Sequence, residues 1–308
     1  MNKLLLFDGN ALMHRAYHAL PPLTTKKGEP INAVYGLTSM LLRVITDHSP
    51  THIAFAFDRP EPTFRKEIHK EYQAQRPEME DELAGQFEKV YQVLSAMGIP
   101  VYSKAGFEAD DVIGTVAKIA SEETRNKTQE TKIDEVIIVT GDRDMLQLVD
   151  NETELLMPGR GLSDSKLYGE SETIERMGVA PSQIVDLKAL MGDASDNYKG
   201  VPGVGPKTAI KLIEDYKTLE NIYRNIDKLP SNVAVKLREN RESADMSYML
   251  AKIRTDVPID FDLETTSKWK IDSKDLIELF EEYGFNTLTS RVKSVGKSVT
   301  SSKQQSLL

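Results

Sequence analysis

The chain has 308 residues, of which 40% are hydrophobic and 28% charged, with a net charge of −9 and no cysteine. This composition is typical of a globular protein with one or two domains, and it excludes disulfides, thiolate metal sites and cysteine nucleophiles. No apolar run reaches the roughly 18 residues of a membrane span, and the apolar stretch after Met1 is too short for a signal peptide. We therefore expect a cytoplasmic protein with no membrane partner.

The first half of the chain alternates short β-rich runs with segments of helical periodicity. Predicted strands are Lys3–Phe7, His52–Phe57, Ile99–Tyr102 and Glu135–Thr140, and predicted helices are Ala33–Asp47, Asp81–Met97 and Ala109–Ser121. Alternation of this kind indicates a parallel sheet covered by helices. We expect an α/β domain over residues 1–175, with a central, mainly parallel twisted sheet.

From about Glu170 onward the sequence is typical of helices. The candidates are Pro181–Met191, Pro206–Tyr216, Asn232–Arg254 and Asp272–Tyr283. We expect a helical region over residues 176–290 and a disordered tail over 291–308, which is rich in Ser, Lys and Gln. Residues 199–254 hold eleven Lys/Arg against seven Asp/Glu, a local charge of +4, so an acidic chain can still present a basic face.

Nine carboxylates occur in short clusters, most of which follow the predicted strands. They are Asp8, Asp58, Glu108, Asp110, Asp111, Asp142, Asp144, Asp193 and Asp196. Any single one could simply cap a helix. Together they would meet at the carboxyl edge of a parallel sheet, where like charges repel and hard cations such as Mg²⁺ or Mn²⁺ would hold them. This pattern predicts two divalent cations and metal-assisted chemistry on phosphate esters.

A glycine-rich segment, GVPGVGPKTA, runs from Gly200 to Ala209 and opens a predicted helix. Its glycines permit a tight turn with exposed backbone N–H groups, and Lys207 and Lys211 add positive charge. We interpret residues 186–216 as a helix–hairpin–helix that binds a DNA backbone without reading sequence. A phosphate loop is disfavoured because Pro206 precedes Lys207, and a plain helix–turn–helix packing unit is the alternative.

The segment Arg59–Arg76 is predicted to be a helix with an apolar and a basic face. Phe64, Ile68 and Tyr72 recur every four residues, and Arg65, His69, Gln73 and Arg76 follow a neighbouring face. A basic stripe with adjacent aromatics could guide a single nucleic-acid strand past Asp58. The alternative is a solvated amphipathic helix.

In combination, the motifs LLLFDGN, FAFDRPEPTFR, GFEADDVIGT, TGDRDMLQLV, MGDASDN and GVPGVGPKTA resemble the 5′-nuclease (flap endonuclease) family, which has a PIN-like fold. The resemblance is greatest to the 5′→3′ exonuclease domain at the N-terminus of bacterial DNA polymerase I and extends to about residue 290. No polymerase or proofreading domain follows, so we expect a stand-alone nuclease or a fragment.

The resemblance also implies roles for individual residues. Asp8, Asp58, Glu108, Asp110 and Asp111 match the group around a first metal, Asp142 and Asp144 lie between the metals, and Asp193 and Asp196 match the second. Arg65, Tyr72, Gln73 and Arg76 match a helical arch over residues 59–100. Gly200, Val201, Gly203, Val204, Gly205, Lys207, Thr208 and Lys211 match the duplex-binding hairpin, where backbone carbonyls hold a K⁺ ion. Gln73 stands where the family usually has a lysine that contacts the scissile phosphate.

The implied function is that of a structure-specific 5′ nuclease in replication and repair. The expected substrates are 5′ flaps, nicks and 5′ ends of duplex DNA and RNA primers on DNA. The expected state is a monomer, with a DNA polymerase acting at the same nick as partner. Two other hypotheses are a small ribonuclease with a similar acidic cleft, disfavoured by the hairpin, and a non-catalytic DNA-binding module, disfavoured by the complete set of nine carboxylates. A D-x-D phosphatase could use Asp142 and Asp144 but would leave the hairpin unexplained.

Overall fold

The computed structural model describes residues 2–124, 132–159 and 165–305. Its central feature is one six-stranded sheet, made of β1 (Lys3–Asp8), β2 (His52–Ala56), β3 (Val101–Tyr102), β4 (Glu135–Val139), β5 (Thr153–Pro158) and β6 (Ser165–Tyr168). The strand order is β3-β2-β1-β4-β5-β6, and every neighbouring pair is parallel except β5 and β6. The predicted mainly parallel sheet is confirmed, and β5 and β6 are additional strands.

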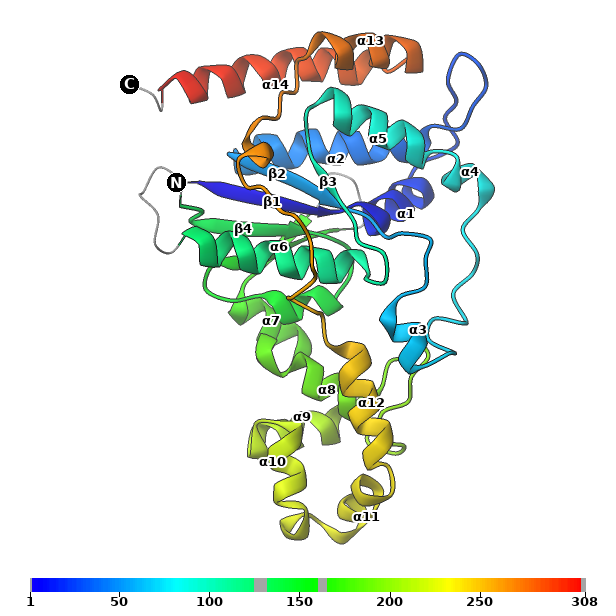
Figure 1. The fold of residues 1–308 in the computed structure, drawn as a ribbon, viewed down its shortest axis with the longest axis vertical. Coiled ribbons are helices and arrows are strands. Elements are labelled where there is room, and N and C mark those ends of the chain that lie inside the picture. Colours follow the sequence, from blue (N-terminus) through cyan, green and yellow to red (C-terminus); the bar gives the residue numbers. More distant parts are fainter. Residues whose placement is uncertain (1, 125–131, 160–164, 306–308) are drawn as a thin grey trace.

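The sheet is covered by helices on both faces because its apolar strand residues alternate between two cores. Leu5 and Phe7 of β1 belong to one core, beneath a layer that contains α1 (Gly9–Ala19), α2 (Asn32–His48), α5 (Phe87–Ala96) and α13 (Lys274–Tyr283). Leu4 and Leu6 belong to the other core, together with α6 (Ala109–Thr124) (Figure 1). Each large side chain buried in this way contributes roughly 1.5–3 kcal/mol. This alternation fixes the register of β1 and hence the position of Asp8 at its end.

A helical region extends from the α6 face of the sheet (Figure 1). Its helices are α7 (Glu170–Met177), α8 (Ile184–Met191), α9 (Pro206–Tyr216), α10 (Leu219–Arg224), α11 (Ser231–Glu239) and α12 (Arg241–Ala251). The predicted helix Asn232–Arg254 is therefore two helices, because the backbone leaves helical geometry at Asn240 (φ −122°, ψ 26°). Across the parts of the chain that the structure describes, none of the helices combines the length and apolar character needed to cross a membrane.

The predicted disordered tail is wrong for residues 291–305. They belong to α14 (Asn286–Gln305), whose first turns pack on α2. Leu288 and Val292 are fully buried there, and Arg291 Nη1 donates a hydrogen bond to Ser39 Oγ at 2.6 Å. A few apolar positions among many polar ones are enough to order this helix, because a tertiary surface is present to receive them. Residues 306–308 lie outside the described residues.

The segment predicted as one helix over Arg59–Arg76 contains only α3 (Phe64–Ile68) and then continues as turns. Tyr72 is buried at 3% exposure whereas Ile68 is 38% exposed, so the predicted common apolar face is wrong. After α4 (Asp81–Ala84), helix α5 packs in the layer over the sheet. The segment that runs beside the carboxyl ends of the strands is thus residues 59–80, here called the crossing segment, and it is shorter than the predicted arch of 59–100.

Candidate active site

The carboxyl ends of β1, β2 and β4 open a cleft at the point where the strand order reverses. β1 lies between β2 and β4, so the connections that leave these strands run to opposite sides and leave a crevice between them. The cleft has a volume of about 630 Å³. Seven of the nine predicted carboxylates line it, namely Asp8, Asp58, Glu108, Asp110, Asp142, Asp144 and Asp196. Asp193 lines an adjoining opening of about 530 Å³ that shares Asp142 and Asp144 with the cleft.

Two of these carboxylates also accept hydrogen bonds from backbone amides of neighbouring segments. Asp8 Oδ1 caps α1 by accepting a hydrogen bond from the Ala11 amide at 3.0 Å, and its Oδ2 accepts one from Thr140 Oγ1 at 2.7 Å. Asp58 Oδ1 accepts from the amide of Ala109 at 2.7 Å, which ties the end of β2 to the start of α6. The sequence left open whether such aspartates are caps or cleft residues, and the structure shows that Asp8 is both.

The carboxylates of the cleft are buried close to one another, and positive charge would stabilise their ionised forms. Burial raises the pKa of Asp8 and of Glu108 to about 7 in each case. The pKa of Asp110 is raised well above its ordinary value, first by burial and then by the neighbouring carboxylates. Among the described residues no hydrogen-bond donor reaches the Asp110 carboxylate, which stands beside Asp142 and Asp8. Hard oxygen ligands that are crowded and uncompensated in this way fit divalent cations such as Mg²⁺.

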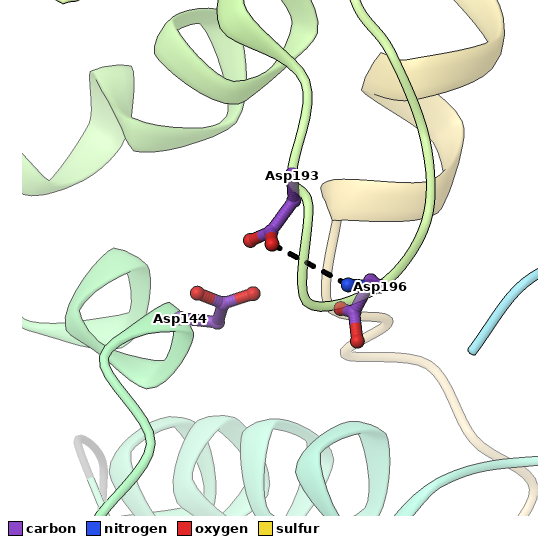
Figure 2. A group of neighbouring side chains, drawn as sticks. All are labelled: Asp144, Asp193 and Asp196. Carbon is purple, nitrogen blue, oxygen red and sulfur yellow. Dashed lines mark hydrogen bonds between the residues drawn. The ribbon is translucent and has the colours of Figure 1, made fainter. Parts of the chain in front are cut away.

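A second group of carboxylates lies beside the first. Asp144, Asp193 and Asp196 each place an oxygen within 4.8 Å of the others, and Asp144 and Asp193 point toward one another (Figure 2). The Asp196 amide donates to Asp193 Oδ1 at 3.4 Å. The Tyr198 hydroxyl is buried with no hydrogen-bond partner in the described structure, and its pKa is raised by burial and by these three aspartates. This group therefore also fits a cation.

Two basic residues already contact the second group. Lys188 of α8 is 7% exposed, and its Nζ contacts Asp144 Oδ1 and lies 2.5 Å from Asp193 Oδ2. Arg76 Nη2 lies 2.7 Å from Asp196 Oδ1. Sequence reasoning found Arg76 but missed Lys188, although a lysine within the apolar helix IVDLKALM was an available signal. His14 of α1 also lines the cleft, and burial lowers its pKa.

Asp111 and Arg65 are paired with each other, which the sequence did not predict. Asp111 is fully buried outside the cleft lining, and both of its oxygens accept from Arg65, at 2.7 Å from Nη1 and 2.9 Å from Nη2. The amide of Arg254 donates to Asp111 Oδ1 as well, at 2.8 Å. Arg65 is 2% exposed and also donates to the Leu250 carbonyl at 2.9 Å. A carboxylate with this set of donors is a poor metal ligand, and a buried, fully bonded guanidinium is a poor partner for a DNA strand.

The remaining residues of the crossing segment meet at Asp196. Tyr72, which is buried, places its hydroxyl 3.3 Å from Glu108 Oε2 and 3.4 Å from Asp196 Oδ2, and so connects the two groups of carboxylates. Gln73 has a left-handed backbone (φ 56°), and its Nε2 lies 3.3 Å from Asp196 Oδ1. Gln73 and Arg76 therefore converge through a turn, and the predicted basic helix face is wrong.

The glycine hairpin between α8 and α9 depends on close backbone packing. Gly200 has φ 59°, and a Cβ there would lie 2.3 Å from the Gly192 nitrogen, so no other residue fits without a shift. Val201 and Val204 are buried, which leaves only their backbone atoms for a ligand. The exposed residues of the turn and of the start of α9 are Pro202, Gly203, Gly205, Pro206 and Lys207, with Thr208 half-buried. Lys211 is exposed but is paired with Asp215 at 2.9 Å.

Comparison with known proteins identifies the family. Residues 3–178 match the 5′-3′ exonuclease N-terminal resolvase-like domain, and residues 179–274 match the 5′-3′ exonuclease C-terminal SAM fold. The chain is 39% identical to DNA polymerase I of Bacillus caldotenax over 293 residues, which are 95% of this chain and 32% of that protein. It is 40% identical to DNA polymerase I of Mycobacterium leprae over 291 residues, 94% of this chain and 31% of that protein. The chain thus spans about a third of the length of these relatives.

Solved structures share the fold. A pseudo-enzyme–product complex of the bacteriophage T5 flap endonuclease with DNA and metal ions superposes with a TM-score of 0.64 at 19% identity, over 97% of this chain and 100% of that one. The catalytic core of Rad2 in complex with DNA substrate gives a TM-score of 0.58 at 16% identity, over 97% and 92%. The predicted fold and the predicted enzyme class, a 5′→3′ exonuclease, are confirmed. The chain belongs to the 5′-3′ exonuclease family and carries the N-terminal and C-terminal domains of that family in order.

Proposed function

We propose that this chain is a structure-specific 5′ nuclease that hydrolyses phosphodiesters at 5′ flaps, nicks and 5′ ends of duplex DNA with two divalent cations. The observation that supports this most directly is the convergence of carboxylates around Asp110 at the switch point of a parallel sheet, where burial and neighbouring carboxylates raise the pKa of Asp110. A cleft of this composition repels phosphate in the absence of cations, so its chemistry and its substrate both require them.

In this proposal the first cation is held by carboxylates from the ends of β1, β2 and β4 and from α6, and the second by the adjoining group. The first set is Asp8, Asp58, Glu108, Asp110 and Asp142, and the second is Asp144, Asp193 and Asp196. Mg²⁺ is the proposed ion, with Mn²⁺ as a substitute. When bound, such cations act as Lewis acids that lower the pKa of water and stabilise charge on the leaving 3′-oxygen. The product would carry a 5′-phosphate.

Residues of this chain position the carboxylates and the substrate. The Tyr72 hydroxyl lies within hydrogen-bond distance of one carboxylate in each group and can donate its proton to either, and burial raises its pKa, so it stays a neutral donor. The crossing segment lies beside the cleft and contributes Arg76, a partly exposed cation for the 5′ strand. The solved T5 flap endonuclease and Rad2 structures contain DNA, which supports a DNA substrate for this chain as well.

The duplex would bind at the glycine hairpin. Gly203, Gly205 and Lys207 are exposed there, at the start of α9, where backbone amides favour a phosphate. A K⁺ ion held by hairpin carbonyls belongs to the same proposal. Lys236 Nζ already donates to the Gly203 carbonyl at 2.9 Å and supplies part of the positive charge that such an ion would bring.

The proposal extends to the wider context of the reaction. RNA primers on DNA are proposed as further substrates because backbone contacts of the hairpin type do not read base sequence. We also propose that the chain acts as a monomer in the cytoplasm and that a DNA polymerase works at the same nick. The polymerase relatives support the last point. The matched region is 32% of the DNA polymerase I of Bacillus caldotenax, so in that protein a region similar to this chain is part of a polymerase.

The test is cleavage of end-labelled flap, nicked and single-stranded DNA with Mg²⁺, followed by mapping of the products. Asp110→Ala and Asp142→Ala should abolish cleavage and largely spare DNA binding. Glu278→Ala, on the exposed face of α13 and paired with Lys274, is the matched control and should cleave like the wild type. Full activity of Asp142→Ala with Mg²⁺ would refute the assignment of the site, and cleavage of RNA alone would refute the substrate.

A further inference from the structure

Lys188 is a buried charge for which the proposed reaction has no role. It comes from α8, its side chain is 8% exposed, and its ammonium contacts carboxylates on two other segments, Asp144 and Asp193. Lysine is rarely buried in this way unless it is paired. Figure 2 shows the three carboxylates of the second group. Lys188 is paired with two of them, so it lies at the place proposed for a metal ion.

The Lys188 ammonium neutralises part of the negative charge of the second group. Asp144, Asp193 and Asp196 carry −3, and Lys188 with Arg76 brings +2, so the five groups sum to −1. Asp144 Oδ1 and Asp193 Oδ2 are both oriented toward Nζ, and Asp193 Oδ1 is held by the amide of Ser195 at 2.7 Å. The lysine thus keeps the carboxylates converged without a metal.

A divalent cation and the ammonium would compete for the same carboxylates. Both are compact positive charges, and Nζ already contacts one oxygen of Asp144 and one of Asp193, which are two of the three carboxylates that could hold a cation. The opening beside them is lined by Lys188 together with Asp142 and Ser195, so the ammonium can withdraw from the carboxylates without unfolding of α8. The Tyr198 hydroxyl is buried near the same carboxylates and has no hydrogen-bond partner among the described residues, so the hydrogen bonding of this group is incomplete.

We propose that Lys188 is the resident counter-ion of the Asp144/Asp193/Asp196 group and is exchanged for the second divalent cation when that cation binds. The lysine is a positioning residue: it preorganises the carboxylates in the metal-free protein and lowers the affinity of the site for metal. This inference rests on the proposed second metal site and goes beyond it, because it assigns to this chain an internal competitor for that metal.

The first test counts bound metal and needs no activity. Mn²⁺ is titrated into the metal-free protein and the free ion is followed by electron paramagnetic resonance. Lys188→Met should bind the second Mn²⁺ at least about tenfold more tightly than the wild type, since a unit charge at contact distance changes binding by several times RT even at a high effective dielectric. Lys188→Arg keeps the charge and should not gain affinity. Lys268→Met, an exposed lysine paired with Glu264, is the matched control and should bind like the wild type.

Asp144→Asn separates this inference from the proposed function. It should lose the second Mn²⁺ in both the wild-type and the Lys188→Met background. If Asp144→Asn still binds two Mn²⁺ ions, the proposed second site is wrong. If it loses one ion but Lys188→Met binds no more tightly than the wild type, or if Lys188→Arg gains as much as Lys188→Met, only the role of Lys188 is overturned.

A second measurement uses the wild-type protein and so does not depend on whether a variant folds. Lysines are labelled briefly with an amine-specific reagent, with and without saturating Mg²⁺, and the label is mapped by mass spectrometry. Exchange for the cation frees the ammonium, so labelling of Lys188 should rise severalfold while that of Lys268 stays constant. Unchanged or reduced labelling of Lys188 with Mg²⁺ would overturn the proposal.

Discussion

Arg65 and Asp111 form a bidentate ion pair inside the protein, with Nη1–Oδ2 and Nη2–Oδ1 distances of 2.7 and 2.9 Å and less than 3% exposure for either residue. The pair connects α3 of the crossing segment to the first turn of α6, which also carries Asp110. It explains how a short helix is anchored beside the cleft, because a guanidinium fork matches a carboxylate in one orientation only. We therefore expect the pair to stabilise the protein and to position α3.

Removing one partner of this pair should destabilise the protein strongly. We expect Arg65→Ala to lower the free energy of unfolding by roughly 3–5 kcal/mol, because it leaves the buried Asp111 carboxylate without its cation. Asp111→Ala should cost less, because Arg65 Nη1 still has Glu108 Oε2 at 3.3 Å. The double variant Arg65→Leu/Asp111→Leu should be less destabilised than the sum of the two single variants. Urea denaturation measures all three. An Asp111→Ala variant that is as stable as the wild type but has lost Mn²⁺ would instead support the predicted role of Asp111 as a metal ligand.

The metal-free protein should lose stability as the pH rises. The pKa values of Asp8 and Glu108 are raised to about 7 and that of Asp144 to about 6, so between about pH 4 and about pH 7 the folded state holds protons that the unfolded state has released. The free energy of unfolding should therefore fall through that window, by a few kcal/mol in total. Denaturation with a chelator at about pH 5 and about pH 8 measures the loss.

Two conditions should reduce this pH dependence. Saturating Mg²⁺ should restore stability at high pH, because the cation binds the ionised carboxylates of the folded state. Asp110→Asn should make the metal-free protein more stable than the wild type at about pH 8, since it removes one of the crowded charges. A wild-type stability that is independent of pH without metal would show that burial and repulsion do not raise the pKa of these carboxylates in the folded protein.

We expect Arg76 to contact the scissile phosphate in place of the lysine that the family usually has at position 73. Its guanidinium lies 2.7 Å from Asp196, beside the uncharged Gln73, whereas Arg65 is committed to Asp111. We expect Arg76→Ala to lower the single-turnover cleavage rate by about tenfold or more, a change of ~1.4 kcal/mol in the barrier. Gln73→Lys should have little effect alone and should restore part of the rate in the Arg76→Ala background. A rate increase with Gln73→Lys alone would mean that no cation fills that position in the wild type.

The hairpin offers a matched pair of glycine substitutions. Gly200→Ala should destabilise the protein by roughly 1–3 kcal/mol and weaken DNA binding, because φ is 59° and the new Cβ would lie 2.3 Å from the Gly192 nitrogen. Gly205→Ala should be tolerated, because its φ is −94° and nothing lies within 4 Å of its Cβ position. Denaturation and DNA affinity at one fixed salt concentration test both variants. Equal affinity for the two variants would show that the shape of the hairpin does not matter for DNA.

Local sequence patterns predicted some helices correctly and failed where tertiary contacts determine the backbone conformation. Helix α9 begins and ends where the sequence indicates, at Pro206 and Tyr216, because proline favours a first helical turn. The segment after Ile68 keeps a helical pattern in the sequence but turns in the structure. The side chains that follow α3 form hydrogen bonds with Asp196 instead of extending the helix. They are Tyr72, Gln73 and Arg76, and Asp196 is over a hundred positions away in the chain. No local pattern encodes that contact.

The sequence alone determined the family, the parallel sheet and the set of carboxylates, because strand ends in such a sheet must meet at one edge. Only the tertiary structure decided how the charges pair. It assigned Asp111 to Arg65, Asp196 to Arg76, and Asp144 with Asp193 to Lys188. The physical reason is that burial makes an unpaired charge costly, and these four aspartates are the ones to which the fold brings a lysine or arginine. Which cation that is depends on packing between segments far apart in the chain.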